Sequence, residues 1–471
     1  MACLRNAGRK RRVWRGTWQG ILVSCLLSTA QGQTPVKAIA PKKFRLRPQG
    51  QVVSIPYASN ASLSRSSDQF TRAVVVIHGT LRNANDYYQR LFEASVVADS
   101  AFRQALIVAP QFLTEADIEA FYLPESYLYW SQSGWKQGDL SQSSDAHPRP
   151  VRVSSFAVVD SILFAIAAAM PQVKIIVIAG HSAGGQFVNR YAAGSPVEPV
   201  LVEKYGIHLR YVVANPSSYL YFNEERRVGN STDQFAVPAG ADLMACPGYN
   251  DYKYGLANLN SYMARAGSAK IREQYPRREV IYLLGGQDDD PGAAGLDTRC
   301  GAMLQGSTRL ERGVVYFHYL QHFFGPEILR YQRRAMVPGV GHDSAKMFAS
   351  SCGVYFLFDY GACQATTRVE RAIERAAAKR VELQPNYPNP FNPETTIRVR
   401  LYQSMRITLE VVNDTGELIK TLVQNEFWPA GLHVVSWDGC NQHSRRVGSG
   451  VYYCRLVAPH LTRSLPLCLI R

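Results

Sequence analysis

Beyond its first 32 residues, the chain of 471 residues has no long apolar run. No segment there approaches the ~18 consecutive apolar residues that a membrane-spanning helix needs. Cysteine pairs in C-x-x-C spacing are also missing, so a zinc ribbon is not expected. Dense basic runs and the fingerprints of nucleic-acid-binding folds are absent too. We therefore expect neither a metal site nor a nucleic-acid partner.

Acidic residues are absent from positions 1–32, which carry six lysines or arginines. A short apolar run, Trp18–Ala30, follows this basic start and ends in small residues, in the order of a signal peptide that is removed on export. Leu22–Cys25 also resembles a lipoprotein cleavage box, but the apolar run continues past Cys25. Without those six charges the net charge falls from +15 to +9, which indicates a mildly basic surface.

Cysteine is scarce outside the signal peptide. The seven cysteines that follow it are Cys246, Cys300, Cys352, Cys363, Cys440, Cys454 and Cys468. Export favours disulfides, and an odd number leaves at least one thiol unpaired or paired between molecules. We favour Cys440–Cys454, because these two flank predicted strands that should be neighbours. Cys300–Cys352 and Cys352–Cys363 are the alternatives.

Apolar segments of strand length, by contrast, are abundant and alternate with helical patterns. Apolar residues make up 46% of the chain and charged residues 19%, which is enough for a sizeable core. Continuous apolar runs are typical of strands covered on both faces. Strands are predicted at 51–57, 72–77, 105–109, 173–179, 209–215, 279–284 and 334–337, and helices at 85–98, 153–170, 186–193, 301–324 and 344–358. This alternation predicts an α/β fold with a mostly parallel sheet.

The stretch around Ser182 has the pattern G-x-S-x-G, from Gly180 to Gly184, between a buried strand and a helix. A serine on so sharp a turn needs small neighbours, and the helix directs its N-terminal N–H groups at whatever binds the serine. The pattern therefore predicts a nucleophile elbow. An inert strand-to-helix turn is the alternative.

An elbow serine needs a histidine that takes its proton and a carboxylate that orients the histidine. In this arrangement the chain order is serine, acid, histidine, each after a strand. The strand at 279–284 leads into three consecutive aspartates, of which we favour Asp288, the first out of the turn, over Asp290. A solvated turn or a calcium loop could also use such a cluster. The last predicted strand leads into His342, the predicted base.

Two N–H donors should hold the oxygen that becomes negative in a tetrahedral intermediate. One is expected from Ala183, directly after the nucleophile. The other is expected from Thr80 or a neighbour, because His78-Gly79-Thr80 follows the strand after which an oxyanion loop is placed. His78 itself is predicted to be a packing residue. Together these residues predict a serine hydrolase that forms an acyl-enzyme and needs no cofactor.

Two further features leave a choice between function and structure. His318 and His322 have metal-ligand spacing on a predicted helix, but no glutamate lies between them, so a helix-face pair is favoured. The aromatic segment Phe121–Asp139 could line a substrate cleft or fill the core. The same choice is open for Tyr249, Tyr252 and Tyr254.

The predicted site residues, as a set and in this order, resemble the α/β-hydrolase superfamily over residues 50–365. The resemblance rests on His78-Gly79, Gly180–Gly184, the Asp288 turn and Gly341-His342. Segments 78–84, 215–219 and 247–255 look like a little-characterised secreted branch of bacteria and fungi. Membership implies hydrolysis, most often of carboxylic esters, and leaves the small-molecule or polymeric substrate open.

The C-terminal part has a different pattern. Residues 366–382 form a charged linker, predicted to be helical over 368–381, and a proline-rich entry follows from Leu383. Short alternating strands are predicted at 397–401, 406–412, 419–423, 432–437 and 451–457. Such strands, separated by turn residues, predict a small β-sandwich.

Residues 383–471 closely resemble the immunoglobulin-like C-terminal sorting domain of type IX secretion cargo. The matching stretches are Asn386–Pro393, Asp414–Gly416, Ala430–His433, Trp437–Gly439 and Ser449–Tyr452. The resemblance implies passage across the outer membrane by its secretion machinery, hence a secreted or surface-attached protein of Gram-negative type. Arg445-Arg446, where a glycine is usual, and Cys468 depart from the pattern and leave processing of this tail open. A plain adhesive β-domain is the alternative.

The sequence thus predicts an exported hydrolase of carboxylic esters. Two alternatives remain at this point. One is an inactive hydrolase-like protein that binds a surface or a carbohydrate, and the other is an amide or peptide hydrolase that uses the same three side chains.

Overall fold

The computed structural model describes residues 34–471 except 97, 99–103, 364–380, 403 and 459–460. The predicted signal peptide lies outside the described residues. So does the predicted linker helix, apart from Val381, which begins a strand. None of the helices in the described part of the chain has the length and apolarity that crossing a membrane would require.

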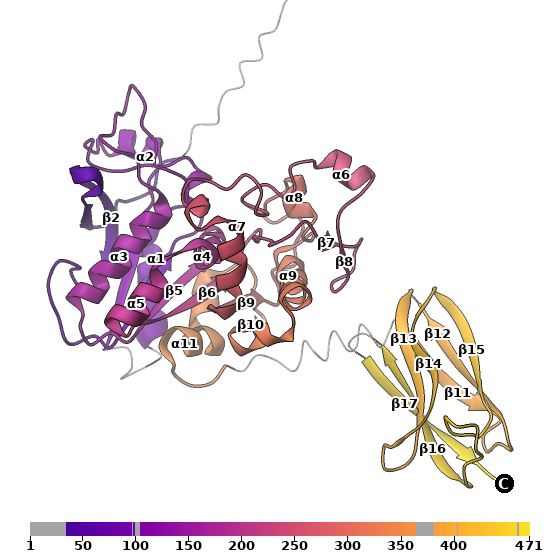
Figure 1. The fold of residues 1–471 in the computed structure, drawn as a ribbon. Coiled ribbons are helices and arrows are strands. Elements are labelled where there is room, and N and C mark those ends of the chain that lie inside the picture. Colours follow the sequence, from indigo (N-terminus) through magenta and orange to yellow (C-terminus); the bar gives the residue numbers. More distant parts are fainter. Residues whose placement is uncertain (1–33, 97, 99–103, 364–380, 403, 459–460) are drawn as a thin grey trace, which may run out of the picture.

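An eight-stranded sheet organises the larger part of the chain (Figure 1). Its order is β1 (Lys42–Leu46), β2 (Val53–Ser59), β4 (Ala105–Pro110), β3 (Arg72–Ile77), β5 (Ile175–His181), β6 (His208–Ala214), β9 (Glu279–Gly285) and β10 (Gln332–Val337). Only β2 runs against the others, because it pairs antiparallel with both β1 and β4 while the remaining pairs are parallel. This order, with its single reversed strand, is that of the α/β-hydrolase fold, as predicted.

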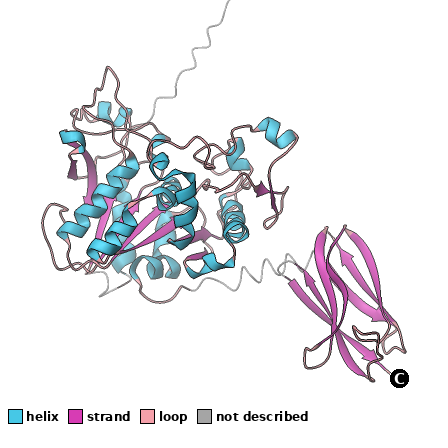
Figure 2. Ribbon diagram, viewed as in Figure 1, coloured by secondary structure: helices cyan, strands magenta, loops and turns pink. Residues whose placement is uncertain are grey.

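Helices cover both faces of this sheet (Figure 2). In β3, Ala73 and Val75 belong to one core, whereas Val74 and Val76 belong to the other. The first core takes in α3 (Ser155–Ala169), α4 (Ala183–Gly194), α5 (Val197–Tyr205), α7 (Met263–Gln274) and α9 (Arg309–Phe324), and the second takes in α1 (Ala84–Val96), α10 (Ser344–Ala349) and α11 (Ser351–Phe358). Because both faces are buried, the residues that point to one face and those that point to the other are all apolar. The strands therefore appear in the sequence as continuous apolar runs.

Two predicted helices are each interrupted by a new N-cap. The helix expected at 301–324 is α8 (Cys300–Met303) followed by α9, where the Thr308 side chain accepts from the N–H of Glu311. The helix expected at 344–358 is α10 followed by α11, where the Ser350 side chain accepts from the N–H of Gly353. A capping oxygen satisfies an N–H that has no partner inside its helix, so each break is stable.

Several smaller elements lie outside the predicted pattern. β1 was not predicted, because cationic residues interrupt its apolar ones, and neither were α5 and α7. The remaining elements are α2 (Glu115–Ala120), α6 (Ala241–Ala245), β7 (Arg226–Arg227), β8 (Phe235–Ala236), and the 3₁₀ helices Pro48–Gly50, Gly134–Gln137, Tyr275–Arg277 and Pro326–Arg330.

The C-terminal residues form a separate β-sandwich with its own core. One antiparallel sheet contains β11 (Val381–Tyr387), β12 (Thr395–Leu401) and β15 (Gly431–Trp437), and the other contains β14 (Leu418–Trp428), β13 (Met405–Val412), β16 (Gly450–Ala458) and β17 (Leu461–Leu469). Residues of both sheets, such as Val399 and Leu409, share one buried core. The predicted sandwich is confirmed, but β11 and β17, each of which contains a proline, were missed.

The predicted Cys440–Cys454 disulfide is wrong. Disulfides join Cys246 to Cys300 and Cys352 to Cys363, so one alternative is confirmed and Cys300–Cys352 is wrong. Cys440, Cys454 and Cys468 are free. β15 and β16 belong to different sheets, and Cys454 is buried between the sheets whereas Cys440 lies in the turn after β15. Nearness in sequence did not place the two sulfurs together.

Candidate active site

Ser182 sits in the turn between β5 and α4, at the carboxyl edge of the sheet. Its backbone has φ 60° and ψ −120°, a conformation that non-glycine residues rarely adopt. Its N–H donates to the carbonyl of Ala214 at the end of β6, at 3.0 Å. The elbow predicted from the pattern is therefore present, and its strain is held by hydrogen bonding to the neighbouring strand.

The glycines of the G-x-S-x-G pattern are required by close backbone approaches. A Cβ on Gly184 would lie 2.1 Å from the carbonyl oxygen of Ile77, and one on Gly180 would lie 2.3 Å from the carbonyl carbon of Gly184. Both distances are far below contact distance, and the obstructing atoms belong to the backbone. Any side chain here would push α4 away from the sheet.

The loops after β9 and β10 are joined to each other by backbone hydrogen bonds. The N–H of Gly286 donates to the carbonyl of Val337 at 2.9 Å, and the N–H of Gln287 donates to that of Val340, also at 2.9 Å. The side chain of Asn215, at the end of β6, accepts from the N–H of Gly285 at 2.8 Å and donates to the carbonyl of Gly341 at 3.2 Å. These contacts hold the loops after β9 and β10 together, beside the end of β6.

Ser182, His342 and Asp288 form one continuous chain of hydrogen bonds. His342 Nε2 lies 2.9 Å from Ser182 Oγ, and His342 Nδ1 lies 2.7 Å from Asp288 Oδ2. The side chain of Asp288 is 2% exposed, whereas that of His342 is 27% exposed. The structure thus brings the predicted nucleophile, base and acid together. Asp290 is turned elsewhere, since its Oδ1 accepts from the N–H of Gly292 at 2.8 Å.

Arg309, on the first turn of α9, was not singled out in the sequence. Its Nη1 lies 3.5 Å from Asp288 Oδ1, on the side of the carboxylate away from His342. Its Nη2 donates to the carbonyl of Ala294 at 2.8 Å, and Nε donates to Ser217 Oγ at 3.4 Å. Burial lowers the pKa of this guanidinium, and the neighbouring Asp288 opposes that shift. No short motif could have revealed the contact, because α9 begins 21 residues after Asp288.

His181, directly before the nucleophile, packs against the base. Its ring centroid lies 4.6 Å from that of His342, and the residue is 3% exposed. Burial, with a smaller contribution from His342, lowers the pKa of His181 well below its ordinary value. His181 is therefore neutral at pH 7, and it adds no positive charge beside the ring that would accept a proton.

The loop that carries Thr80 lies against the first turn of α4. A Cβ on Gly184 would be 2.8 Å from the carbonyl oxygen of His78, which measures how closely the loop and the turn approach. Thr80 is exposed, and Ala183 is the first residue of α4, where N–H groups have no intrahelical acceptor. Both predicted N–H donors are thus carried by segments next to Ser182.

His78 is a structural residue, as predicted. Its Nε2 accepts from the N–H of Phe112 at 3.0 Å, and its Nδ1 donates to the carbonyl of Gly79 at 2.9 Å. Its ring packs against Trp135 with centroids 4.5 Å apart. Burial lowers the pKa of His78 to about 4, so the ring stays neutral and fixes the loop.

The two histidines with metal-ligand spacing have separate partners. His318 Nδ1 lies 2.9 Å from the carbonyl of Thr232, and His322 Nε2 lies 3.0 Å from Glu225 Oε2. Among the described residues no group of three or more potential ligands surrounds a point where a metal could bind. The helix-face reading fits both side chains.

The aromatic residues left open by the sequence are mainly core. Trp130 and Trp135 are fully buried in the first core, whereas Tyr122 is 92% exposed. Tyr249 and Tyr254 are buried, and the Tyr252 hydroxyl donates to the carbonyl of Gln137. Trp135 therefore supports the loop that carries Thr80 through its contact with His78.

Comparison with protein-family models and with curated proteins finds no match. Among solved structures, the chain is similar to LpqC, a poly(3-hydroxybutyrate) depolymerase from Bordetella parapertussis, with 23% identity over 71% of this chain and 95% of that chain and a TM-score of 0.45. A poly(aspartic acid) hydrolase-1 from Sphingomonas sp. KT-1 is 22% identical over 66% of this chain and 96% of that chain, with a TM-score of 0.41. The latent dimeric PorU of Porphyromonas gingivalis is similar over 19% of this chain and 9% of that chain, at 18% identity and a TM-score of 0.17. The fold assignment rests on this chain's own topology: the strand order, the single reversed strand and the elbow after β5 are those of the α/β-hydrolase fold.

Proposed function

We propose that the protein is a serine hydrolase that cleaves carboxylic esters. The observation that supports this most strongly is the hydrogen-bonded chain from Ser182 Oγ through His342 to Asp288, at 2.9 and 2.7 Å. Ser182 has the strained backbone conformation of an elbow and directly precedes the N-terminus of α4. A nucleophile, a base within reach of its proton and a buried acid behind the base are what acyl transfer requires.

In this proposal Ser182 Oγ attacks the carbonyl carbon of the ester while His342 Nε2 takes the hydroxyl proton. Asp288 accepts the hydrogen bond from Nδ1–H, so it holds the tautomer that leaves Nε2 free to act as a base, and it stabilises the imidazolium that forms. His342 then donates the proton to the leaving alcohol, and an acyl-enzyme remains. A water molecule, deprotonated by the same imidazole, releases the acid and restores Ser182.

The negative oxygen of the tetrahedral intermediate is assigned to the N–H groups of Ala183 and Thr80. Both donors belong to the backbone, and the first also has the positive end of the α4 dipole behind it. Donors that are already aligned need no reorganisation as charge develops, and this makes such a site effective. No cofactor takes part in any of these steps.

Hydrolysis of short p-nitrophenyl esters tests the proposal. We expect Ser182→Ala to lower kcat by at least ~10³-fold, because it removes the nucleophile. Ser64→Ala, a change of the same size at an exposed serine, should leave kcat unchanged. Wild-type turnover no faster than that of Ser182→Ala would favour an inactive protein that binds a surface or a carbohydrate. Cleavage of p-nitroanilides that Ser182→Ala abolishes would favour the amide hydrolase.

We also propose that the protein is exported and that the C-terminal sandwich directs the last step. This rests on the basic and apolar order of residues 1–32 and on the match of segment 383–471 to type IX sorting domains. The sandwich has a core separate from those of the catalytic sheet, as a detachable signal domain would need. The outer-membrane secretion machinery is then its partner.

A further inference from the structure

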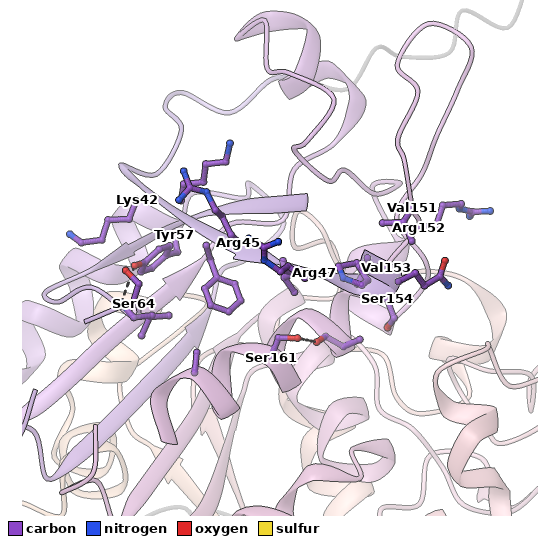
Figure 3. Close-up of a pocket in the computed structure, with 18 of the residues that line it drawn as sticks. Lys42, Arg45, Arg47, Tyr57, Ser64, Val151, Arg152, Val153, Ser154 and Ser161 are labelled. Carbon is purple, nitrogen blue, oxygen red and sulfur yellow. Dashed lines mark hydrogen bonds between the residues drawn. The ribbon is translucent and has the colours of Figure 1, made fainter. Parts of the chain in front are cut away.

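A cavity of about 1010 Å³ lies between the edge strand β1 and helix α3 (Figure 3). This cavity is distinct from the candidate active site, because it is not lined by Ser182, His342 or Asp288. Its walls come from β1 and the turn after it, residues 62–64, residues 151–154 and the outer face of α3. The volume is of the size that accommodates one ligand molecule.

Apolar side chains form the floor of this cavity. Phe44, Val151, Ala157 and Ala165 line it, and each packs against the first core while remaining partly exposed. Phe44 lies on the same face of β1 as the buried Leu46, two residues on. Apolar surface that stays accessible in a concave site favours a ligand that has an apolar portion of its own.

Cationic side chains surround this apolar floor. Six cations, Lys42, Lys43, Arg45, Arg47, Arg152 and Arg265, line the cavity, and no aspartate or glutamate does so among the described residues. None of the six lies within ion-pair distance of a carboxylate in the described part of the chain. Arg152 Nε donates to the carbonyl of Ser141, and Arg265 interacts electrostatically with Asp160, which is itself engaged by tyrosine hydroxyls. The rim therefore carries an excess of uncompensated positive charge.

Two of the six cations, Lys43 and Arg45, have side chains on the other face of β1. Side chains alternate along a strand, so Lys43 and Arg45 point away from the face that carries Phe44. Lys43 Nζ lies 4.5 Å from the centroid of the Tyr127 ring, which agrees with this orientation. Lys43 and Arg45 therefore add positive charge at the edge of the cavity without facing its apolar floor. The matched control is taken from outside the lining, where Lys174 and Arg277 are exposed cations.

We propose that this cavity binds a single amphiphilic anion, a carboxylate or phosphate head group on an apolar chain. The positive rim complements the head group, and the floor around Phe44 and Ala165 complements the chain. A polar polyanion would leave the apolar floor unused. A bilayer surface would meet a concave site that it cannot enter. The inference does not depend on the ester hydrolysis proposed for Ser182.

Titration calorimetry on the full chain, below the micellar concentration of each ligand, tests the proposal. Dodecanoate and dodecyl phosphate should both bind, and their relative affinities identify the preferred head group. Dodecyltrimethylammonium has the same chain with the opposite charge and should not bind, and acetate and inorganic phosphate lack the chain and should bind at least about tenfold more weakly. Heparin probes the alternative of a polymeric polyanion.

Variants locate the binding. Arg47→Gln combined with Arg152→Gln should weaken dodecanoate binding at least about tenfold, because it removes two cations from the rim. Lys174→Gln combined with Arg277→Gln makes the same charge change outside the cavity and should leave the affinity unchanged. Ala165→Trp should abolish binding by filling the floor. Turnover of p-nitrophenyl acetate should be the same in all of these variants.

Three results would overturn the proposal. The first is the absence of a binding heat for both dodecyl anions. The second is an equal loss of affinity in the two double variants, which would mean a diffuse effect of surface charge. The third is heparin binding that dodecanoate does not displace and that is lost with Arg47 and Arg152, which would reassign the site to a polymeric polyanion.

Discussion

At the scale of single residues, the carboxyl group of Asp288 depends on its neighbours. It is almost completely buried, and a buried carboxylate is costly unless charged or polar neighbours compensate it. Oδ2 meets His342 and Oδ1 faces Arg309, so each oxygen has its own partner. Arg309 is hydrogen-bonded to neither Ser182 nor His342, and we regard it as a positioning residue that holds Asp288 in line with His342.

Replacing Arg309 should therefore affect catalysis more than substrate binding. We expect Arg309→Gln to lower kcat about tenfold, equivalent to about 1.4 kcal/mol, with little change in KM. Arg309→Lys should restore part of the loss, because it returns the charge without the fork of donors. Active-site titration would correct for any unfolded fraction. Unchanged kcat per folded molecule, with only lower stability, would mean that Arg309 serves the fold alone.

A single methyl group at the elbow should be enough to disrupt it. In Gly184→Ala the added carbon would meet the Ile77 carbonyl oxygen at 2.1 Å, and neither backbone segment can move without breaking the β3–α4 contact. We expect a loss of about 3 kcal/mol or more in the free energy of unfolding, measured by urea denaturation. Gly292→Ala, whose Cβ would find its nearest neighbour at 3.4 Å, is the control. Equal stability of the two variants would contradict the steric account.

Helix α3 carries the clearest pH-sensitive group of the described fold. Asp160 accepts hydrogen bonds from the hydroxyls of Tyr191 and Tyr262, at 2.7 and 2.8 Å. Burial raises the pKa of its carboxyl from 3.8 to about 6, and these hydroxyls only partly oppose the shift. Three elements, α3, α4 and the start of α7, thus meet at one carboxyl group that resists ionisation.

The raised pKa fixes the direction of the pH dependence. Between about pH 4 and pH 6 the native state holds this proton and the unfolded state has lost it, so the contribution of Asp160 to stability falls as pH rises through that window. In the wild type this lowers the free energy of unfolding by up to about 3 kcal/mol across that window, and we expect Asp160→Asn to remove the decrease. The measurement is urea unfolding at pH 4 and pH 7 for wild type, Asp160→Asn and the exposed Asp145→Asn. A stability difference between wild type and Asp160→Asn that is the same at both pH values would refute this.

On the scale of the whole molecule, the chain consists of an α/β-hydrolase unit and a β-sandwich with separate cores. Each has its own sheets, and the strands of one are not paired with those of the other in the described residues. Because β11 begins at Val381, a cut before that residue removes the sandwich without leaving an unpaired strand. The two units can therefore be separated experimentally.

Removing residues 381–471 should separate export from catalysis. In a host with type IX secretion, we expect the truncated protein to keep its ester hydrolysis and to accumulate in the periplasm. Cell fractionation with p-nitrophenyl ester turnover in each fraction measures this. A periplasmic reporter fused to 381–471 should in turn reach the outside. Truncated protein in the medium at wild-type levels would assign the sandwich to adhesion instead.

Much of this organisation was predictable because its causes are local. A strand buried on two faces must be apolar at consecutive positions, and an elbow must have small residues around its serine. The pattern around Ser182, the loop of Asp288 and the loop of His342 could therefore be recognised, together with the α/β class and the C-terminal sandwich. The breaks at Thr308 and Ser350 were missed although small polar residues mark both: Gly306-Ser307-Thr308 precedes Glu311 in the spacing of a helix start, and Ser350-Ser351 interrupts the second apolar run.

What only the tertiary structure decided depends on which distant segments meet. The Cys246–Cys300 disulfide joins the end of α6 to the start of α8, 54 residues apart in sequence, and the partner of Asp288 on α9 follows from how that helix packs. The cross-link by Asn215 joins three strand ends that are far apart in the chain. The cationic cavity exists because β1, which the sequence pattern did not show as a strand, faces α3 across it. Local composition determines how a segment folds, whereas contacts between remote segments arise only when burial of the whole core selects one packing.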